Sequence, residues 1–399
     1  MKRTTSLIQK ATVATIGFLL CVPILSRFIE IPKRKLDGVA MEYSHPRWSW
    51  KAVKKGKYQK GWEVWSTRDN PVWSWSIAST NELVYRLTGE LSLDYVTSIQ
   101  GGNDGYFWQP MYLKSFNGTR KPQAAVIEER FQQLAQAQEL LALHNVTLIG
   151  LINPNILQLY PELIPDKYKA IVPGPKDYDI ALEAIQRHKP EVFDAFARLK
   201  EEQPSYPIKF FEPTGSHWND IASCLTVKGL SSKLADSWKE SIPDPRCESY
   251  SMEYPPRPSD TDLVAIANLL FPRSLLRPAP YVQTPVPATL KKPRKILLVG
   301  TSFLFAIEKE LLRRKIADTT TLLFYFKQIR KDGEGNFYGF DRRKITKEFL
   351  LRYDAIIVDA NVSAPGSMGR GILPVIIKAL QQETSSTPTT VEQSQMRKN

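Results

Sequence analysis

The sequence predicts an α/β fold in which helices cover the faces of a sheet. Residues 123–145 carry apolar side chains at helical spacing, and residues 146–154 form a short, nearly continuous apolar run. The same alternation returns further along the chain, where residues 353–361 form another apolar run. Buried strands that alternate with amphipathic helices are typical of sheets covered by helices.

The composition fits this class and narrows the choice of partners. The chain has 399 residues, of which 42% are hydrophobic and 24% are charged, as in ordinary globular domains. The formal net charge of +13 favours an anionic partner, which could be nucleic acid, a membrane surface or an acidic polymer. Charge alone does not choose among them.

Residues 1–30 have the pattern of a membrane signal anchor. Lys2, Arg3 and Lys10 precede residues 11–25, which carry no charge, and no small-x-small cleavage site follows. We therefore expect an uncleaved single-pass anchor in the inner or cell membrane. The basic start favours a periplasmic or extracytoplasmic location for the rest of the chain, although the basic residues after the apolar run favour the opposite orientation.

The rest of the chain divides into three predicted parts. Residues 31–120 are rich in aromatic and basic residues and are expected to form a membrane-proximal arm that packs on the α/β domain of residues 121–380. Interleaved Trp and Lys also occur where proteins stack on nucleic-acid bases, but we expect no nucleic-acid partner for an anchored protein. The polar residues 381–399 are expected to be a disordered tail.

The elements of the α/β domain follow from their patterns. In order, we expect a helix at residues 123–145, a strand at 146–154, a helical region at 179–203, an extended run at 208–219, a helix at 220–238, a strand and helix within 294–315, and a last strand at 353–361. A proline-rich stretch between residues 255 and 293 is expected to be irregular.

Three polar residues stand where predicted strands end. Ser302 lies on a Gly-Thr-Ser turn between a strand and a helix, His217 lies within "EPTGSHWNDIAS" at residues 212–223, and Asn361 closes the last strand. The carboxyl ends of parallel strands meet at one edge of a sheet, so we expect these residues to share a crevice.

These residue types suit acyl transfer through a serine nucleophile. Ser302 would be activated by His217 as its base, and the helix start at Thr301 together with Asn361 could stabilise an oxyanion. Each residue alone has a structural interpretation. Thr and Ser are usual helix caps, Asn is a usual turn residue, and a His beside a Trp is often a packed pair. The combination favours catalysis.

Two cysteines, Cys224 and Cys247, follow the His217 motif. We expect them to be close enough to form a disulfide in an oxidising compartment, the alternative being two unrelated buried thiols. Neither lies near a His at metal-ligand spacing, so we expect no metal and no cofactor.

The motifs resemble those of the SGNH-hydrolase-like alginate O-acetyltransferases of the AlgX/AlgJ type. The resemblance rests on "TGSHWN" at residues 214–219 followed by "VGTSF" at residues 299–303. It continues in "GGNDGYFW", "INPNILQLYPELIP" and "DAIIVDAN", so that it covers roughly residues 50–380. The motifs are weak singly and more specific in this order.

The resemblance implies a three-layer SGNH-hydrolase-like domain in which Ser302 accepts the acyl group and His217 is its base. The implied acceptor is a secreted or cell-surface polysaccharide, as in exopolysaccharide biosynthesis, and the net charge of +13 suggests that it is acidic. The implied acetyl donor is a multi-spanning membrane acyltransferase.

One departure from the family pattern concerns the triad acid. The family has Asp-x-His-Trp, but this chain has Gly215 at the acid position. Loss of the acid from a Ser-His-Asp triad can lower the rate by ~10⁴-fold. Glu212 and Asp220 are the nearest substitutes, and a backbone carbonyl could also orient His217 in a Ser-His dyad.

Two classes of function remain open. The first is an O-acetyltransferase with a Ser-His acyl-enzyme mechanism. The alternative is a non-catalytic polysaccharide-binding or scaffolding component of an export or acetylation complex. A secreted carbohydrate esterase is the second enzymatic reading, because it differs only in that water accepts the acyl group.

Overall fold

The structure, a computed structural model, describes residues 2–26, 29, 31–38, 48–65, 71–91, 100–101, 103–170, 172, 174–283 and 290–381. The chain forms two compact units. One comprises residues 1–101 with 261–276, and the other comprises residues 102–260 with 277–399. The boundary predicted near residue 120 falls inside the second unit. The tail predicted at residues 381–399 lies outside the described residues from 382 onward.

The first unit is mainly helical. Its elements are α1 (Lys2–Leu25), α2 (Trp50–Lys54), α3 (Lys57–Val64), α4 (Pro71–Thr88), β1 (Gln100–Gly101), α11 (Asp262–Ile266) and η7 (Pro272–Leu275). Buried polar side chains of α4 hold the distant segment 261–276. Asn81 donates to the carbonyl of Ala267 at 2.8 Å, and Glu82 accepts the amide of Phe271 at 3.1 Å.

The anchor expected over residues 1–30 is not supported. Among the residues that the structure describes, no helix combines the length and the apolar character needed to cross a membrane. Helix α1 does extend over Lys2–Leu25, but its first part carries Lys2, Arg3 and Lys10, and only residues 11–25 are free of charge. A bilayer core requires about 20 predominantly apolar residues.

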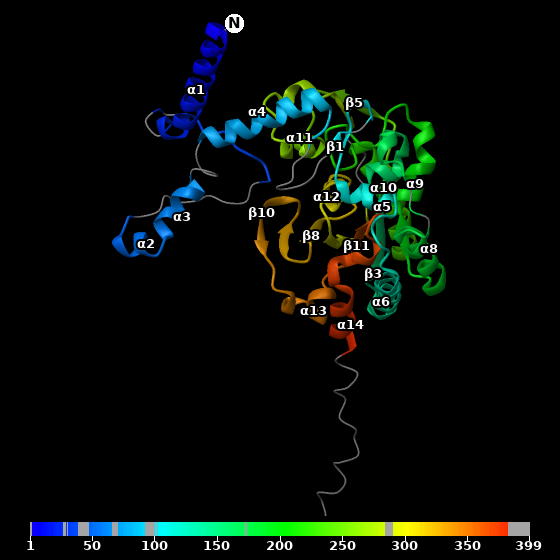
Figure 1. Cartoon of the computed structure of the whole chain (residues 1–399). Coiled ribbons are helices and arrows are strands. Elements are labelled where there is room, and N and C mark those ends of the chain that lie inside the picture. The colour runs from blue at the N-terminus through cyan, green and yellow to red at the C-terminus, as the bar shows by residue number, and fades with distance from the viewer. Residues whose placement is uncertain are drawn as a thin grey trace, which may run out of the picture. The chain divides into compact units, whose positions relative to one another are not determined.

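The second unit is built on a mixed seven-stranded sheet with strand order β10-β9-β8-β7-β11-β3-β4 (Figure 1). The strands are β3 (Thr147–Asn153), β4 (Val192–Asp194), β7 (Lys295–Gly300), β8 (Thr319–Phe324), β9 (Gln328–Lys331), β10 (Glu334–Gly339) and β11 (Ala355–Asn361). β8, β7, β11, β3 and β4 run parallel to one another, whereas β9 pairs antiparallel with β8 and β10 pairs antiparallel with β9. The predicted α/β class is confirmed.

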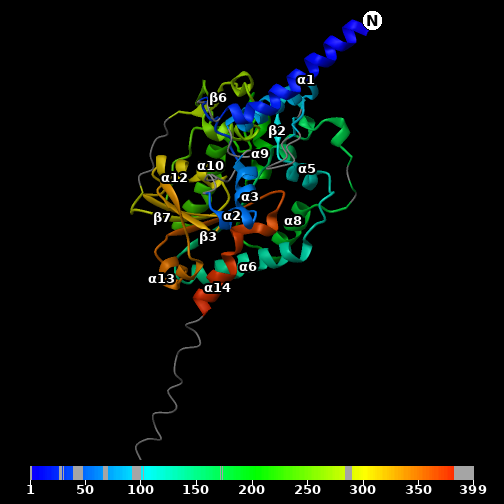
Figure 2. The same ribbon diagram turned by 60° about the vertical axis from the view of Figure 1, so that its left-hand side comes forward.

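Helices cover both faces of this sheet, so that the unit has three layers. In Figure 2, α6 (Ala124–Ala142) and α14 (Leu373–Gln381) lie together on one side of the strands, and α10 (Asp220–Trp238) and α12 (Leu304–Arg313) lie on the other. Helix α6 buries Ile127, Phe131, Leu134 and Leu141 along one stripe, as its spacing predicts.

Shorter elements complete the second unit. They are η2 (Asn103–Gly105), β2 (Phe107–Trp108), α5 (Pro110–Phe116), α7 (Ile156–Leu159), η3 (Pro161–Leu163), η4 (Asp166–Tyr168), α8 (Asp177–His188), α9 (Ala195–Glu202), η5 (Gln203–Ser205), β5 (Tyr250–Glu253), η6 (Pro258–Asp260), β6 (Ala279–Val282), η8 (Arg342–Lys344), α13 (Lys347–Leu350) and η9 (Pro365–Gly371). Strands β5 and β6 form a separate antiparallel pair.

The single helical region expected at residues 179–203 is wrong, because the structure divides it into α8, strand β4 and helix α9. Lys189 ends α8 with a left-handed backbone (φ 51°), and Pro190 cannot continue a helix. Val192 then pairs with Gly150 of β3, which makes this short segment the edge strand of the sheet.

Two further differences concern extended segments. Residues 208–219 do not form a strand of the sheet, since their only strand-like pairing among the described residues is an isolated bridge between Phe211 and Trp218. Strands β8 to β10 were not anticipated, although Asp332-Gly333 between β9 and β10 is a typical hairpin turn.

The predicted pairing of the two cysteines is confirmed. Cys224 of α10 and Cys247 form a disulfide with a Cα–Cα distance of 5.7 Å and a sequence separation of 23 residues. Closing a loop of this length stabilises a folded chain by about 3 kcal/mol in the chain-entropy model. The bond attaches the segment before β5 to the helix that follows the His217 motif.

A buried carboxylate fixes the turn that follows β7. Asp359 of β11 is fully buried and accepts the amide of Thr301 at 2.7 Å and its hydroxyl at 2.5 Å. It also accepts the side-chain amide of Asn153 at the end of β3. A Cβ at Gly300 would lie 1.6 Å from Oδ1 of Asp359, so that no side chain fits there.

We expect Gly300→Ala to destabilise the protein by more than about 3 kcal/mol, because the new methyl group would displace the Asp359 carboxylate from a packed interior. Urea unfolding measures the change. Gly339→Ala at the end of β10 is the matched control, since a Cβ there meets nothing within 4 Å. Equal unfolding midpoints for the two variants would contradict this account.

Candidate active site

Ser302 lies between strand β7 and helix α12, as the sequence predicts. The carbonyls of Thr301 and Ser302 accept the amides of Leu304 and Phe305 at 3.2 and 3.1 Å, which begins the helix directly after the serine. Ser302 is half-buried, whereas Thr301 and Phe303 on either side are buried. The serine side chain is therefore the accessible group of this turn.

His217 reaches Ser302 from a loop rather than from a strand end. Its Nε2 lies 2.7 Å from Oγ of Ser302, so the predicted contact between these two residues is confirmed. The imidazole also packs against the ring of Phe303, with centroids 5.1 Å apart. Nε2 is thereby placed to accept the proton of the serine hydroxyl.

The loop that carries His217 is held by hydrogen bonds at both of its ends. The amide of Asn219 donates to the carbonyl of Phe210 at 2.9 Å, beside the bridge between Phe211 and Trp218. Within the loop, the hydroxyl of Thr214 donates to the carbonyl of Asp260 at 2.9 Å. These contacts restrict the approach of His217 to Ser302.

The second ring nitrogen of His217 faces a hydroxyl. Nδ1 lies 3.2 Å from Oγ of the buried Ser216. When Nε2 accepts the serine proton, Nδ1 carries the ring hydrogen and donates it to this hydroxyl. Ser216 can thus help to orient the imidazole, but it carries no negative charge to stabilise an imidazolium.

The family's acid position is closed by neighbouring backbone. A Cβ at Gly215 would lie 2.8 Å from the carbonyl oxygen and 2.9 Å from the carbonyl carbon of Asp260. Contacts shorter than 3 Å to rigid backbone require the chain to move. An aspartate at residue 215 is therefore excluded by packing, in addition to being absent from the sequence.

The two carboxylates suggested as substitutes are directed elsewhere. Glu212 accepts the side-chain amide of Asn219 at 3.1 Å. Asp220 accepts the amide of Val282 at 2.9 Å and lies near the cations of Arg257 and Lys309. Of the hydrogen bonds within the described residues, none joins either carboxylate to His217.

Glu212 is nevertheless electrostatically unusual. Burial raises the pKa of its carboxyl to about 7, with a further contribution from the charge of Asp260. The hydrogen bond from Asn219 and the charge of Arg277 partly oppose this rise. The carboxyl group thus titrates close to neutral pH behind the His217 loop.

The two residues expected to stabilise an oxyanion are engaged in structural contacts. Both donors of Thr301 are directed at Asp359. Asn361 donates to the carbonyl of Pro154 at 2.8 Å and accepts from Ser363 and Asn155, which joins the loops after β11 and β3. The oxyanion role stays a prediction for both residues.

The backbone amide of Ser302 is a stronger candidate donor. Within the part of the chain that the structure describes, it donates to no acceptor, unlike the amide of Thr301 before it. It stands at the start of α12, where the helix dipole also favours a negative charge.

The described residues contain no group of three or more His, Cys, Asp or Glu residues that could hold a metal.

The sequence analysis singled out Asn361 at the end of this strand and missed the role of Asp359 in the turn. Burial in a dense apolar region raises the pKa of this carboxyl to about 6, although the hydrogen bonds from Thr301 lower it. A charged residue inside the apolar run of residues 354–361 was the available signal. Such a residue is rarely buried without a partner.

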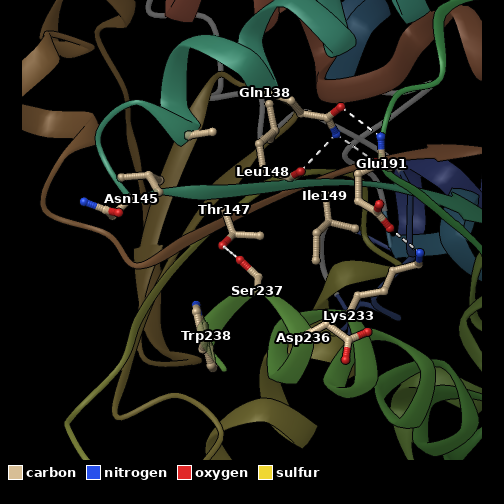
Figure 3. A pocket seen from close by; sticks show the side chains of 12 residues that line it. Gln138, Asn145, Thr147, Leu148, Ile149, Glu191, Lys233, Asp236, Ser237 and Trp238 are labelled. Atoms are coloured by element: carbon tan, nitrogen blue, oxygen red, sulfur yellow. Dashed lines mark hydrogen bonds and ion pairs between the residues drawn. The ribbon is translucent and has the colours of Figure 1, made fainter. Parts of the chain in front are cut away.

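A cavity of about 550 Å³ lies at the other end of the strands. Figure 3 shows Thr147, the first residue of β3, in its wall, with Asn145, Ser237 and Trp238 beside it. Thr147 is six residues before Asn153, or about 20 Å along the strand. The ion pair of Lys233 with Glu191 lies in the same wall, and the cavity is separate from Ser302.

We expect Glu212→Gln to change how stability depends on pH. A carboxyl with a raised pKa binds more protons when folded, so the wild type loses stability as pH rises from the unfolded value of 4.5 through about 7. Between about pH 5 and about pH 8, the variant should gain about 2–3 kcal/mol relative to wild type. Urea unfolding at both pH values measures this, with exposed Glu139→Gln as the control. Parallel pH profiles for Glu212→Gln and wild type would refute it.

We expect Gly215→Asp not to restore a triad. Its Cβ would meet the Asp260 backbone, and such overpacking should cost about 2 kcal/mol or more in the free energy of unfolding. Gly215→Ala introduces the same Cβ without the carboxylate and should lose a similar amount of stability. A stable Gly215→Asp variant that hydrolyses activated acetyl esters faster than wild type would show that the position is open.

Comparisons with known proteins agree with the motifs. The family model described as "SGNH hydrolase-like domain, acetyltransferase AlgX" matches residues 102–309, which include both Ser302 and His217. No match was found among curated proteins.

Three solved structures illustrate the similarity. The O-acetyltransferase domain of Pseudomonas putida AlgJ is 13% identical, with 72% of this chain and 99% of that chain covered and a TM-score of 0.44. Bacillus cereus PatB1 is 10% identical, with 67% and 97% covered and a TM-score of 0.43. Pseudomonas aeruginosa AlgX is 15% identical, with 70% and 67% covered and a TM-score of 0.40.

Proposed function

Because the chain belongs to the SGNH hydrolase-like family of the acetyltransferase AlgX, we propose that it is an O-acetyltransferase acting on a secreted or cell-surface polysaccharide. The observation that carries this proposal is the 2.7 Å contact between Nε2 of His217 and Oγ of Ser302. A nucleophile at the start of a helix, paired with a histidine base, is the arrangement that acyl transfer through an acyl-enzyme requires.

In the first half of the reaction, Ser302 takes the acetyl group from its donor. His217 removes the hydroxyl proton while Oγ attacks the acetyl carbonyl, and the amide of Ser302 can donate to the resulting oxyanion. The bond from the carbonyl carbon to the donor then breaks. The departing group receives the proton from His217, and acetyl-Ser302 remains.

In the second half, a hydroxyl of the polysaccharide attacks acetyl-Ser302. His217 now removes the proton of that hydroxyl, and the proton returns to Oγ of Ser302 as the ester bond to the enzyme breaks. Ser216 supports the required tautomer from Nδ1. Because residue 215 carries no acid, we infer that Ser302 and His217 carry the reaction, which should be slower than with an aspartate at that position.

We also propose that the enzyme works outside the cytoplasm and takes its acetyl group from a multi-spanning membrane acyltransferase. The Cys224–Cys247 disulfide supports the location, because such bonds persist mainly in oxidising compartments. The net charge of +13 supports an acidic acceptor such as a uronate-containing exopolysaccharide.

The absence of an acid at Gly215 favours a second candidate, a polysaccharide-binding or scaffolding protein that has kept the fold without the activity. A secreted carbohydrate esterase differs from the transferase only in the acceptor. Acylation of Ser302 would support an enzyme and argue against the scaffold. An assay with a glycan acceptor would then show whether the acetyl group passes to the glycan or to water.

We expect Ser302→Ala and His217→Gln each to lower the transfer of acetyl groups from 4-nitrophenyl acetate to polysaccharide by at least about 10⁴-fold, because the two side chains act as one unit. Mass spectrometry of the wild type should find a single acetyl group on the peptide that contains Ser302. Thermal unfolding controls for folding, and half-buried His144→Gln is the control for loss of an imidazole. Acetyl transfer that persists in Ser302→Ala would leave the scaffold as the better reading.

A further inference from the structure

Arg370 has an unusual position and backbone at the carboxyl edge of the sheet. It lies in η9, shortly after the end of β11, and has a left-handed backbone (φ 54°, ψ 27°) between Gly369 and Gly371, which also have positive φ. A left-handed conformation is unfavourable for a residue with a side chain and often marks a functional site. The side chain is half-buried.

The guanidinium of Arg370 contacts a residue, Tyr325, that is hydrogen-bonded to the strand end before Ser302. It stacks over the ring of Tyr325, with a distance of 4.7 Å to the ring centroid. The amide of Tyr325 in turn donates to the carbonyl of Gly300 at 2.7 Å, two residues before Ser302. The charge of Arg370 also lowers the pKa of Asp359, which places it near the same strand ends.

Arg370 differs from Arg294, Arg314 and Arg330 in that it makes no ion pair among the described residues, although its charge acts on the buried Asp359. Arg294 pairs with Glu240 at 2.8 Å, Arg314 pairs with Glu310 at 2.9 Å, and Arg330 pairs with Glu308. Across the described residues, Arg370 makes no hydrogen bond or ion pair, and its Nε, like those of Arg294 and Arg330, is buried without an acceptor. An unpaired cation with restricted access to water is costly, and a ligand anion would relieve that cost.

Aromatic side chains extend from Tyr325 along the same edge. Tyr325 is 38% exposed, and its ring lies 4.4 Å from that of Phe324. Phe324 continues to Phe305, which follows Ser302 by three residues, and to Phe337, with centroids 5.1 and 5.2 Å apart. Aromatic faces with a small number of directed polar groups are typical of ligand sites.

We propose that Arg370, held on Tyr325, binds the carboxylate of a uronic acid residue in the acceptor polysaccharide and so positions a neighbouring sugar hydroxyl at Ser302. A guanidinium fork matches a planar carboxylate with two parallel hydrogen bonds. The inference rests on the proposed acetyltransferase function with its uronate-containing acceptor, and extends it to one residue that binds that acceptor.

The test compares an oligouronate acceptor with the same oligosaccharide after its carboxyl groups are reduced to alcohols, using 4-nitrophenyl acetate as donor. Arg370→Gln should raise KM for the oligouronate by about 10- to 100-fold with kcat within about twofold, because a charged hydrogen-bonded contact to the acceptor is lost. The variant should use the reduced acceptor as wild type does. Arg343→Gln is the matched control, since Arg343 is 90% exposed and paired with Asp341.

Acylation of Ser302 separates this inference from the proposed function. The burst of 4-nitrophenol should be unchanged in Arg370→Gln, because the donor does not meet the carboxylate site. A normal burst with an unchanged KM for oligouronate, or equal KM values of wild type for both acceptors, would overturn the inference and leave the acetyltransferase standing. If the wild type gives no burst, the proposed acetyltransferase activity is rejected. Calorimetric titration of the wild type and Arg370→Gln with oligouronate would then test the carboxylate site by its binding affinity alone.

A conservative variant controls for the possibility that Arg370→Gln is misfolded. Arg370→Lys keeps the positive charge but loses the planar fork, so its KM should lie between those of wild type and Arg370→Gln. Thermal unfolding should show both variants folded. A KM for Arg370→Lys equal to that of wild type would show that charge alone, and not the fork, binds the acceptor, and would overturn the bidentate contact.

Discussion

The buried carboxylate of Asp359 joins the ends of three neighbouring parallel strands. It receives the amide and hydroxyl of Thr301 after β7 and the side-chain amide of Asn153 at the end of β3, while itself belonging to β11. Gly300 is required because Asp359 occupies the space of its missing side chain. The turn that presents Ser302 is therefore set by one acid that touches neither His217 nor Ser302 among the described contacts.

His217 is positioned by packing and by the hydrogen bonds of its loop. Its ring lies against Phe303, and its loop is joined to Asp260 through Thr214. The same Asp260 backbone closes the space at Gly215 in which the family's acid would stand. Because the loop lies so close to residue 260, residue 215 has no room for the side chain of an acid.

Charge is distributed unevenly between the interior and the carboxyl edge of the sheet. Interior arginines such as Arg294 and Arg314 have acidic partners, so their charges serve the fold. Arg370 makes no ion pair among the described residues and stacks on Tyr325, whose amide is bonded to Gly300 at the strand end before Ser302. Unpaired charge and accessible aromatic surface coincide where the proposed acceptor would bind.

Local patterns in the sequence determined the elements that depend on nearest neighbours. The period of α6, the apolar runs of β3, β7 and β11, the Gly-Thr-Ser turn and the disulfide partners were predicted and are found. Only the tertiary structure decided that β4 is a strand, that the His217 segment is a loop, and that residue 215 has no room for an acid. These outcomes depend on contacts with residues distant in sequence, such as Gly150 for β4 and Asp260 for Gly215, whose proximity no local pattern encodes.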